Sequence, residues 1–388
     1  MQAIGADIPC FGVLGLNMNK NELSLISQSF EGRTVLITGH TGFKGAWLTA
    51  WLKQLGAKVV GVALDSPTDL SHFSAAHLAD QITDLRIDIR NRNALEEAII
   101  SVQPDIVFHL AAQALVWRSY EDPLETWETN VMGTLHVLDA LRKLDRPCAA
   151  VIITSDKCYD NVEWVWGYRE TDAMGGGDPY SASKGAAELA IRSYIKSYFP
   201  NATSKVRIAS ARAGNVIGGG DWATNRIVPD CVKAWSTGDL VELRNPHSTR
   251  PWQHVLEPLS GYLRLAIALS QRTEVHGEAF NFGPQAQQNY SVLELVQQMA
   301  LHWDQVRWQD VSRSVAGPYE SGLLKLNCDK ALHYLQWHAV MGFEDTVRMT
   351  AEWYQAYYQK SEKILSTTNS QISAYTAIAK QHGLAWAQ

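Results

Sequence analysis

The alternation of apolar, strand-like runs with amphipathic helical stretches restricts the fold of this chain more than any other feature of its sequence. Strand patterns occur at "RTVLIT", "KVVGVAL", "DIVFHLAA", "AAVIITS" and "KVRIASARA", and helical patterns lie between them. Repeated strand–helix units imply a parallel sheet with helices on both faces, whose strands are buried on both sides. We therefore predict an α/β fold with a doubly wound parallel sheet and a smaller, mixed α/β lobe in the C-terminal part.

The length of the chain and a change in its composition indicate how it is divided into domains. Its 388 residues suggest two domains, or one large unit with a second lobe. From about Arg212 the sequence becomes glycine-rich and irregular, as in "RAGNVIGGGDW". We predict a sheet domain at 31–211, to which residues at about 225–275 return, and a substrate-binding lobe at 212–360. Residues 1–30 are predicted to be an extension outside the fold, and residues 361–388 a mobile tail.

Composition excludes several classes of protein. The formal net charge of −6 argues against a protein that binds nucleic acid through a broad basic surface. No apolar run approaches the roughly 20 residues that span a bilayer, and the first 30 residues lack the features of a signal peptide. No CxxC pair and no metal-binding histidine spacing occurs, and the cysteines are scattered at 10, 148, 158, 231 and 328. We expect reduced thiols, a cytoplasmic location and no metal.

A glycine-rich turn predicts a dinucleotide site. Gly39, Gly42 and Gly45 form a G-x-x-G-x-x-G pattern between the strand "VLIT" and a helix. Glycines there permit a tight turn and let the backbone approach a pyrophosphate at the positive end of the helix. Asp65 follows Gly45 by 20 residues, where an acid can accept the ribose hydroxyls of NAD and repel a 2′-phosphate. The alternatives are a turn without a ligand and, for Asp65, a solvated turn residue.

A tyrosine and a lysine predict alcohol oxidation. Tyr180 and Lys184 lie four residues apart, so their side chains share one face of the predicted helix. An ammonium and an oxidised nicotinamide ring would both favour the phenolate and lower the tyrosine pKa from about 10. Such a tyrosine can take a proton from an alcohol while hydride leaves the same carbon. Because Y-x-x-x-K is common on ordinary helices, the prediction depends on its position after "VIITS", where Ser155 can bond the same hydroxyl.

The glycine turn, Ser155 at a strand end and the Tyr180/Lys184 pair together resemble the extended short-chain dehydrogenase/reductase superfamily. This resemblance implies a Rossmann-type sheet. Within it, longer strings resemble the CDP-glucose 4,6-dehydratase family: "GHTGFKGAWL", "TSDKCYDN", "WGYRE", "DPYSASK", "RAGNVIGGGDWATNRIVPD" and "RNPHSTRPWQHVLEPLSGYL". The resemblance covers about residues 30–358 and leaves out both ends. It implies a lyase that converts CDP-glucose to CDP-4-dehydro-6-deoxyglucose, for deoxysugar synthesis of the kind that supplies lipopolysaccharide.

The implied reaction gives a purpose to Asp156 and Lys157, which directly follow Ser155. In that reaction the C4 hydroxyl is oxidised, with Tyr180 as base and NAD taking the hydride. The new ketone acidifies the C5 proton, so that water can leave from C5 and C6. By resemblance, Asp156 protonates the departing C6 hydroxyl and Lys157 removes the C5 proton, whereas related dTDP-glucose dehydratases carry Asp-Glu here. Burial and nearby positive charge would have to lower the lysine pKa from about 10.4. Neighbours on a strand point to opposite faces, so the chain must turn near Ser155. The alternative is a surface ion pair.

The resemblance also implies binding residues for the cofactor and the nucleotide sugar. NAD would be tightly held, with contacts from the glycine turn, Asp65, Asp88 and the Tyr180/Lys184 pair. Further cofactor contacts are expected from Thr41, Phe43, Ile89, Ala111 and Gln113. Residues 205–250 carry seven Lys/Arg against four acids, which suits a diphosphate, although a solvated basic surface is an alternative. Asn215 and Arg250, and less strongly Arg226 and Lys233, are the expected diphosphate ligands.

Three other functions stay open. A nucleotide-sugar 4-epimerase would keep the Tyr180/Lys184 pair but does not need Asp156 and Lys157. A dehydratase for GDP-mannose or dTDP-glucose shares the chemistry but usually has glutamate in place of Lys157. A catalytically silent NAD-binding regulator tends to lose the tyrosine or the lysine. The sequence does not decide between NAD and NADP. Superfamily members often dimerise through two helices, so we expect a homodimer or dimer of dimers and neither nucleic-acid nor membrane partners.

Overall fold

The computed structural model describes residues 25–200, 203–304, 306–312, 323–359 and 363–388. A seven-stranded sheet forms its centre, with the order β11-β6-β5-β4-β1-β2-β3 and every neighbouring pair parallel. The strands are β1 (Thr34–Thr38), β2 (Lys58–Ala63), β3 (Thr83–Arg86), β4 (Ile106–His109), β5 (Cys148–Ile153), β6 (Val206–Ala213) and β11 (Ala279–Phe282). The predicted doubly wound sheet is confirmed, and each of the five predicted strand runs contains a strand of it.

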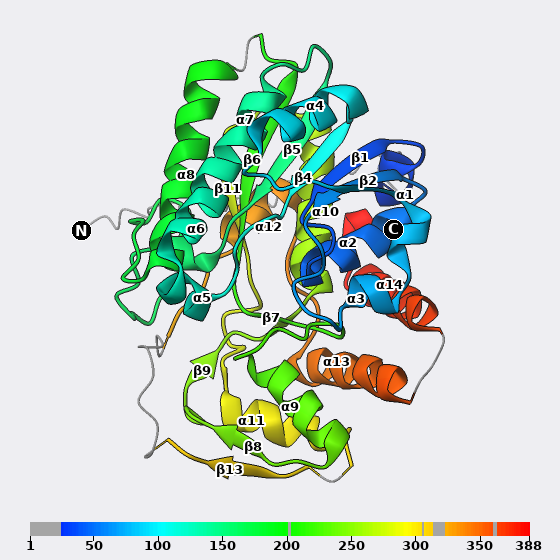
Figure 1. The fold of residues 1–388 in the computed structure, drawn as a ribbon, viewed down its shortest axis with the longest axis vertical. Helices are drawn as coiled ribbons and strands as arrows, with labels where there is room; N and C mark the ends of the chain where they lie inside the picture. The colour runs from blue at the N-terminus through cyan, green and yellow to red at the C-terminus, as the bar shows by residue number, and fades with distance from the viewer. Residues whose placement is uncertain (1–24, 201–202, 305, 313–322, 360–362) are drawn as a thin grey trace, which may run out of the picture.

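Helices cover both faces of the sheet (Figure 1). Alternate strand residues face opposite sides. Leu36, Val107 and Ile152 pack with α4 (Arg92–Val102), α7 (Thr134–Leu141) and α8 (Pro179–Tyr198). Ile37, Phe108 and Val151 pack on the other face with α2 (Phe43–Gln54) and α10 (Leu256–Gln271). The strands are therefore buried on both sides, which explains their continuous apolar runs.

Shorter elements connect these helices and strands. The long helical stretch predicted before β5 is one continuous path that includes a π-helical turn, η3 (Glu128–Gly133), between α6 (Pro123–Trp127) and α7. The others are α3 (His72–Ala75), η2 (Leu78–Gln81), α5 (Val116–Glu121), η4 (Asp156–Cys158) and α12 (Asp329–Leu335).

A smaller lobe lies below the sheet domain in Figure 1. It contains α9 (Ile227–Thr237), α11 (Val292–Met299) and three two-stranded sheets. These sheets pair β7 (Val216–Ile217) with β10 (Gln253–His254), β8 (Val241–Leu243) with β13 (Trp308–Asp310), and β9 (Thr249–Arg250) with β12 (Tyr290–Ser291). The return to the sheet domain differs from the prediction of 225–275, because α9 and β8 stay in the lobe while α10 and β11 pack on the sheet.

The C-terminal segment is part of the core, so the expectation of a mobile tail is wrong for the described residues 363–388. After α13 (Phe343–Tyr358), the helix α14 (Ile364–Gln381) packs on α2 and α13, and η5 (Ala385–Ala387) packs on α1 (Leu25–Phe30). Tyr375 and Phe30 are fully buried, and Trp386 is 2% exposed. The end of the expected N-terminal extension is thus also inside the fold, whereas residues 1–24 lie outside the described part.

Three expectations from composition can be compared with the described residues. The four cysteines among them are free. No group of three or more potential metal ligands occurs in that part of the chain. Within the same ranges, no helix has the length and apolar character needed to cross a membrane.

Candidate active site

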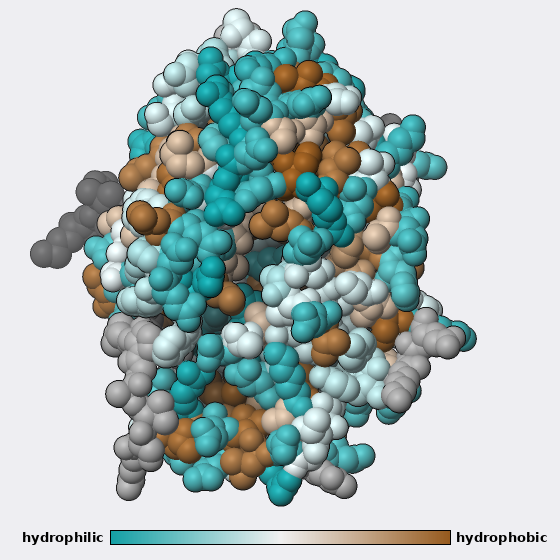
Figure 2. Space-filling model, in the orientation of Figure 1, coloured by the Kyte–Doolittle hydropathy of each residue, from teal (hydrophilic) through white to brown (hydrophobic). Residues whose placement is uncertain are grey.

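The candidate site lies at the carboxyl ends of the central strands. Strand β1 lies between β2 and β4, so the chain leaves β1 toward one side and reaches β4 on the other. Such a switch point is where open α/β sheets form a ligand crevice. Figure 2 shows a recess with hydrophilic walls in this face of the molecule, between the sheet domain and the lower lobe.

The glycine turn has the close backbone contacts that the sequence predicted. Gly39 has a φ of +78°, and a Cβ atom there would lie 2.7 Å from the backbone nitrogen of Ala111 at the end of β4. A Cβ atom on Gly45 would lie 2.1 Å from the carbonyl oxygen of Gly39. Gly42 is the N-cap residue of α2, and no side chain caps this helix. The first amide groups of α2 are thus left to bind an anion.

The other predicted cofactor residues surround this turn. Buried Thr41 donates to the carbonyl of Leu64 (3.0 Å), and exposed Asp65 lies 3.4 Å from Arg86. Asp88 is half-buried, and the hydrogen bonds from Arg90 lower its pKa. The remaining ones are Phe43, packed near Gly218, buried Ile89, half-buried Ala111, and Gln113, whose backbone amide donates to Asn130 (2.9 Å).

Tyr180 and Lys184 lie in the first two turns of α8. The helix begins at Pro179, and the Asp178 carboxylate caps it by accepting from the Ser181 amide (2.9 Å). Both site residues are buried, and Lys184 Nζ lies 6.0 Å from the centre of the Tyr180 ring. Burial lowers the pKa of Lys184 to about 8. Burial also raises the pKa of Tyr180 to about 12, although a hydrogen bond with Ser155 opposes the rise. The lowering expected from the sequence includes the charge of an oxidised nicotinamide ring.

The chain turns at Ser155, as the geometric argument required. Strand β5 ends at Ile153, and the extended Ser155 caps the short helix η4, which contains Asp156 and Lys157. The Ser155 hydroxyl donates to Asp156 Oδ1 (2.9 Å) and accepts from the Lys157 amide (3.2 Å). Asp156 is buried, which raises its pKa although the charge of Lys157 opposes the rise, and Lys157 is half-buried. Burial therefore makes the charged form of this carboxyl group less favourable than in a solvent-exposed aspartate.

Lys44 belongs to the same cluster, whereas from its sequence position it could equally be a phosphate contact or an exposed lysine at the start of a helix. It is half-buried in the first turn of α2, and its ammonium interacts electrostatically with Asp156, Arg226 and Lys184. Burial lowers the pKa of Lys44 to about 8. The residue directly follows Phe43 in the predicted turn, so its place beside the strand ends was the signal that could have identified it.

The basic residues predicted for the nucleotide end are partly engaged with the protein itself. Half-buried Arg226 forms an ion pair with Asp221 (2.7 Å) and interacts electrostatically with Tyr180, so it lies near the catalytic candidates. Half-buried Lys233 donates to the carbonyl of Trp222 (2.6 Å). Asn215 follows β6, and Arg250 lies in β9, both half-buried.

The residues of this basic stretch do not form one surface. Arg212 is buried at the end of β6 and bonds Glu188 in the interior of the sheet domain. Trp222 is 2% exposed among Trp353, Tyr354 and Tyr357, so it fills the core of the lobe in this structure. The local excess of positive charge therefore includes structural as well as accessible groups.

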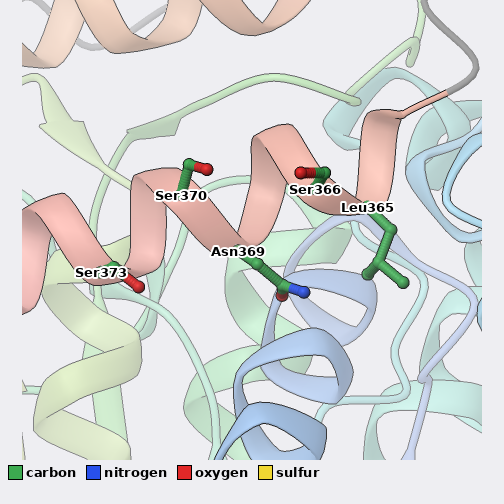
Figure 3. Close-up of a pocket in the computed structure, with 5 residues that line it drawn as sticks. All are labelled: Leu365, Ser366, Asn369, Ser370 and Ser373. Carbon is green, nitrogen blue, oxygen red and sulfur yellow. The ribbon is translucent and has the colours of Figure 1, made fainter.

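A second hollow lies away from the strand ends. Figure 3 shows its lining on α14, where Ser366 and Ser370 point to one side of the helix and Leu365, Asn369 and Ser373 to the other. None of the predicted site residues lines this hollow, which is open to the surface. The strand-end recess is therefore the candidate active site.

Comparisons with known proteins match almost the whole chain. A family model described as GDP-mannose 4,6 dehydratase matches residues 36–350. The CDP-glucose 4,6-dehydratase of Salmonella typhimurium is 46% identical over 356 residues, which cover 90% of this chain and 98% of that protein. The UDP-glucose 4-epimerase of Mycoplasma pneumoniae is 25% identical, over 84% of this chain and 98% of its own.

Solved structures show the same fold. The UDP-glucose-4-epimerase of Stenotrophomonas maltophila, with bound NAD and formylated UDP-arabinopyranose, has a TM-score of 0.72 and 22% identity. The match covers 85% of this chain and 100% of that one. The epimerase Mth375 of Methanothermobacter thermautotrophicus has the same TM-score and identity, over 87% and 97% of the two chains.

Proposed function

The chain belongs to the GDP-mannose 4,6-dehydratase family within the extended short-chain dehydrogenase/reductases, and from this premise we propose that it dehydrates CDP-glucose to CDP-4-dehydro-6-deoxyglucose. The observation that carries the choice of substrate is the 46% identity with a CDP-glucose 4,6-dehydratase over nearly the full length of both chains. The Asp156–Lys157 turn beside Tyr180 supports a dehydratase over an epimerase, which has no need for this pair.

The residues around the glycine turn fit NAD. The close backbone approach at Gly39 and the uncapped start of α2 suit a pyrophosphate, and exposed Asp65 suits the ribose hydroxyls. Lys184 and Tyr180 would lie beside the nicotinamide end. When bound, NAD supplies an acceptor for the C4 hydride and a donor for C6.

We assign the first proton transfer to Tyr180. Its phenol would take the proton of the C4 hydroxyl, with Ser155 bonding the same oxygen. Burial raises the pKa of this tyrosine to about 12, although Ser155 and Arg226 oppose the rise. The positive charges of Lys184 and of the oxidised cofactor would therefore have to lower the pKa of Tyr180.

We assign the elimination to Asp156 and Lys157. The ketone at C4 acidifies C5, so that Lys157 as the free amine can remove the C5 proton while Asp156 protonates the departing C6 hydroxyl. The raised pKa of buried Asp156 supports its role as an acid. The turn at Ser155 supports a shared site, because it takes both residues off the alternating strand geometry.

We propose that the nucleotide end of the substrate extends toward the lobe. Asn215 and Arg250 would bind the diphosphate, with Arg226 and Lys233 as further contacts. The electrostatic interaction of Arg226 with Tyr180 supports its part in this assignment, because the diphosphate is attached to the sugar on which Tyr180 would act.

The proposal includes a homodimer. Leu124, Trp127 and Met132 on α6 and η3, together with Leu189 on α8, are large apolar residues with exposures of 39% to 73%. Met132 and Leu189 lie in the two stretches expected to form the dimer interface, 129–141 and 180–195, and Leu124 and Trp127 precede the first of them. Their exposure supports this assembly. Light scattering coupled to size exclusion would report the mass. A cytoplasmic location and a role in lipopolysaccharide synthesis stay predictions.

A panel of nucleotide sugars tests the substrate assignment. The protein, supplied with NAD, would be incubated separately with CDP-, dTDP- and UDP-glucose and with GDP-mannose, and the products analysed by mass spectrometry. We expect rapid loss of one water from CDP-glucose and much slower loss from the others. Faster dehydration of another nucleotide sugar, or a 4-epimer without loss of water, would contradict it.

Lys157→Met tests the assigned base. The variant should still reduce bound NAD with CDP-glucose, whereas formation of the keto sugar should fall by about 10²–10⁴-fold, the usual contribution of a proton-transferring group. Reduced cofactor absorbance and the product's absorbance in alkali measure the two steps. Lys196→Met, an exposed change on α8, is the control. Normal product formation by Lys157→Met would remove this residue from the mechanism.

A further inference from the structure

A buried polar network lies directly behind the candidate catalytic residues. Glu188 is one turn beyond Lys184 and two turns beyond Tyr180 on α8, so the three side chains share a face of the helix. Its carboxylate accepts hydrogen bonds from Thr154 Oγ1 (2.5 Å) and Ser210 Oγ (2.9 Å). The first of these donors directly precedes Ser155, so Glu188 connects the catalytic helix to the end of β5.

Arg212 extends this hydrogen-bond network toward the Asp156–Lys157 turn. Its Nε and Nη2 donate to the two Glu188 oxygens (2.9 and 2.8 Å), and both residues are almost completely buried. The Nη1 atom donates to the Tyr159 hydroxyl (2.7 Å) and to the Glu170 carbonyl (3.2 Å). The Tyr159 hydroxyl donates in turn to Asn281 on β11 (2.8 Å). Because the Nε, Nη1 and Nη2 atoms of Arg212 all donate to protein groups, we do not assign Arg212 as a ligand for the substrate.

The network fixes the far end of the turn that holds Asp156 and Lys157. Helix η4 has only three residues, so its direction depends on what holds each end. Ser155 caps the beginning, and Tyr159 follows immediately after the end. The bond from Arg212 to Tyr159 therefore joins the end of η4 to Glu188, on the helix that carries Tyr180 and Lys184.

We propose that Glu188, Arg212 and Tyr159 are positioning residues, which hold the Asp156–Lys157 turn at the distance from Tyr180 and Lys184 that elimination requires. The inference rests on the proposed dehydration. C4 oxidation depends on groups of α8 and on Ser155, whereas elimination also needs both residues of η4 in place. Loosening the end of η4 should therefore slow the second step more than the first.

A single hydroxyl can be removed to test this. Tyr159→Phe deletes the bonds to Arg212 and Asn281 without changing the ring. The matched control is Tyr168→Phe, because Tyr168 stacks on Tyr159 but its hydroxyl bonds Asn161 and nearby backbone amides and not Arg212. Stopped-flow absorbance of the reduced cofactor follows the oxidation, and quenched samples measured in alkali follow the keto sugar. Thermal unfolding reports the folded fraction of each variant.

With Tyr159→Phe we expect cofactor reduction to stay within about threefold, while keto-sugar formation falls by roughly 10²-fold, as for a small misplacement of a reacting group. Reduced cofactor should accumulate, and Tyr168→Phe should behave like the unchanged chain. Arg212→Lys keeps a charge for Glu188 but cannot make the same set of bonds, and it should show the same split.

Two results would overturn the proposal. An equal fall of both steps would indicate only a loss of folded protein, and unchanged elimination in both variants would show that the network does not position η4. The unchanged chain distinguishes these from failure of the proposed function. If it removed water from no nucleotide sugar, the dehydration itself would be wrong whatever the variants did.

Discussion

Two buried glutamates anchor two regions of this molecule, and their surroundings differ in one respect. Glu188 holds the catalytic corner, which we define as the start of α8 with Tyr180 and Lys184 and the Asp156–Lys157 turn. Burial would raise the pKa of Glu188, but the charge and hydrogen bonds of Arg212 lower it overall. Glu257 on α10 holds the C-terminal packing, accepting from the Val340 and Met341 amides and from Tyr375 on α14. Burial raises the pKa of Glu257 to about 7, and the described residues place no cation against it.

The difference separates an anchor that does not depend on pH from one that does. A carboxylate paired with an arginine stays ionised over the working range of a protein, so the contact between Glu188 and Arg212 does not depend on the pH. A buried carboxyl group without a cation must lose hydration energy when it ionises, and the hydrogen bonds only partly replace it. The chain therefore combines a Glu188–Arg212 pair of fixed protonation with a buried Glu257 whose ionisation lowers the stability of the folded chain.

Arg212→Met should have the largest effect, because it leaves the Glu188 charge buried without its partner. The free energy of unfolding should fall by about 3–5 kcal/mol. Urea unfolding measures the change, and Arg207→Met is the control, since Arg207 on the same strand donates to the Leu269 and Ser270 carbonyls. The double variant Glu188→Gln/Arg212→Met should recover part of the loss. If Arg212→Met lowered the free energy of unfolding no more than Arg207→Met does, the Glu188–Arg212 pair would not hold the catalytic corner.

The pH dependence at Glu257 should be somewhat smaller. The folded chain keeps a proton on this group up to about pH 7, whereas the unfolded chain releases it near its ordinary value of 4.5. Between these pH values the folded state binds more protons, so the free energy of unfolding should fall with rising pH, by about 3 kcal/mol from this group. Unfolding curves of the unchanged chain and of Glu257→Gln, taken from pH 4.5 to 8, measure it.

The Glu257→Gln curve should be flatter over this range, because its amide does not titrate. Since other groups add their own slopes, the comparison uses the difference between the two curves and not either one alone. Parallel curves would mean that Glu257 is ionised throughout, and the contrast between the two glutamates would fail.

Loss of one hydrogen bond at each glutamate should have the smallest effect. Ser210→Ala removes a donor to an ionised carboxylate and should cost about 1.5–3 kcal/mol at any pH from 5 to 8. Tyr375→Phe removes a donor to Glu257 and should cost about 0.5–1.5 kcal/mol at pH 5, where the acceptor is neutral, and more at pH 8. Chemical unfolding at both pH values measures each cost. A pH-independent cost for Tyr375→Phe would contradict the assigned ionisation.

The sheet and the chemical residues could be predicted from sequence because their signals are local. A buried parallel strand reads as an apolar run, and the four-residue spacing of Tyr180 and Lys184 sets a shared helix face. The turn at Ser155 followed from the demand that Asp156 and Lys157 serve one substrate. Each of these inferences needed only a few neighbouring residues.

The packing of the C-terminal helix α14 was not predicted, because its buried face is partly polar. Thr368 and Gln371 are buried in α14, where Thr368 bonds His72 and Trp353, so the apolar stripe that identifies a core helix is interrupted. The burial of Arg212 was missed for a related reason. Its partner Glu188 lies 24 residues earlier, and only the folded sheet brings them together. A charged residue inside the strand run "KVRIASARA" was the one available signal.

The most direct test of the proposed chemistry follows one hydrogen atom. CDP-glucose carrying deuterium at C4 would be converted by the protein with its bound NAD, and the product examined by mass spectrometry and NMR. If one site oxidises C4, eliminates water and returns the same hydride, the deuterium should appear at C6 of the keto sugar in nearly full amount. Deuterium that stays at C4 or is lost to solvent would contradict the account.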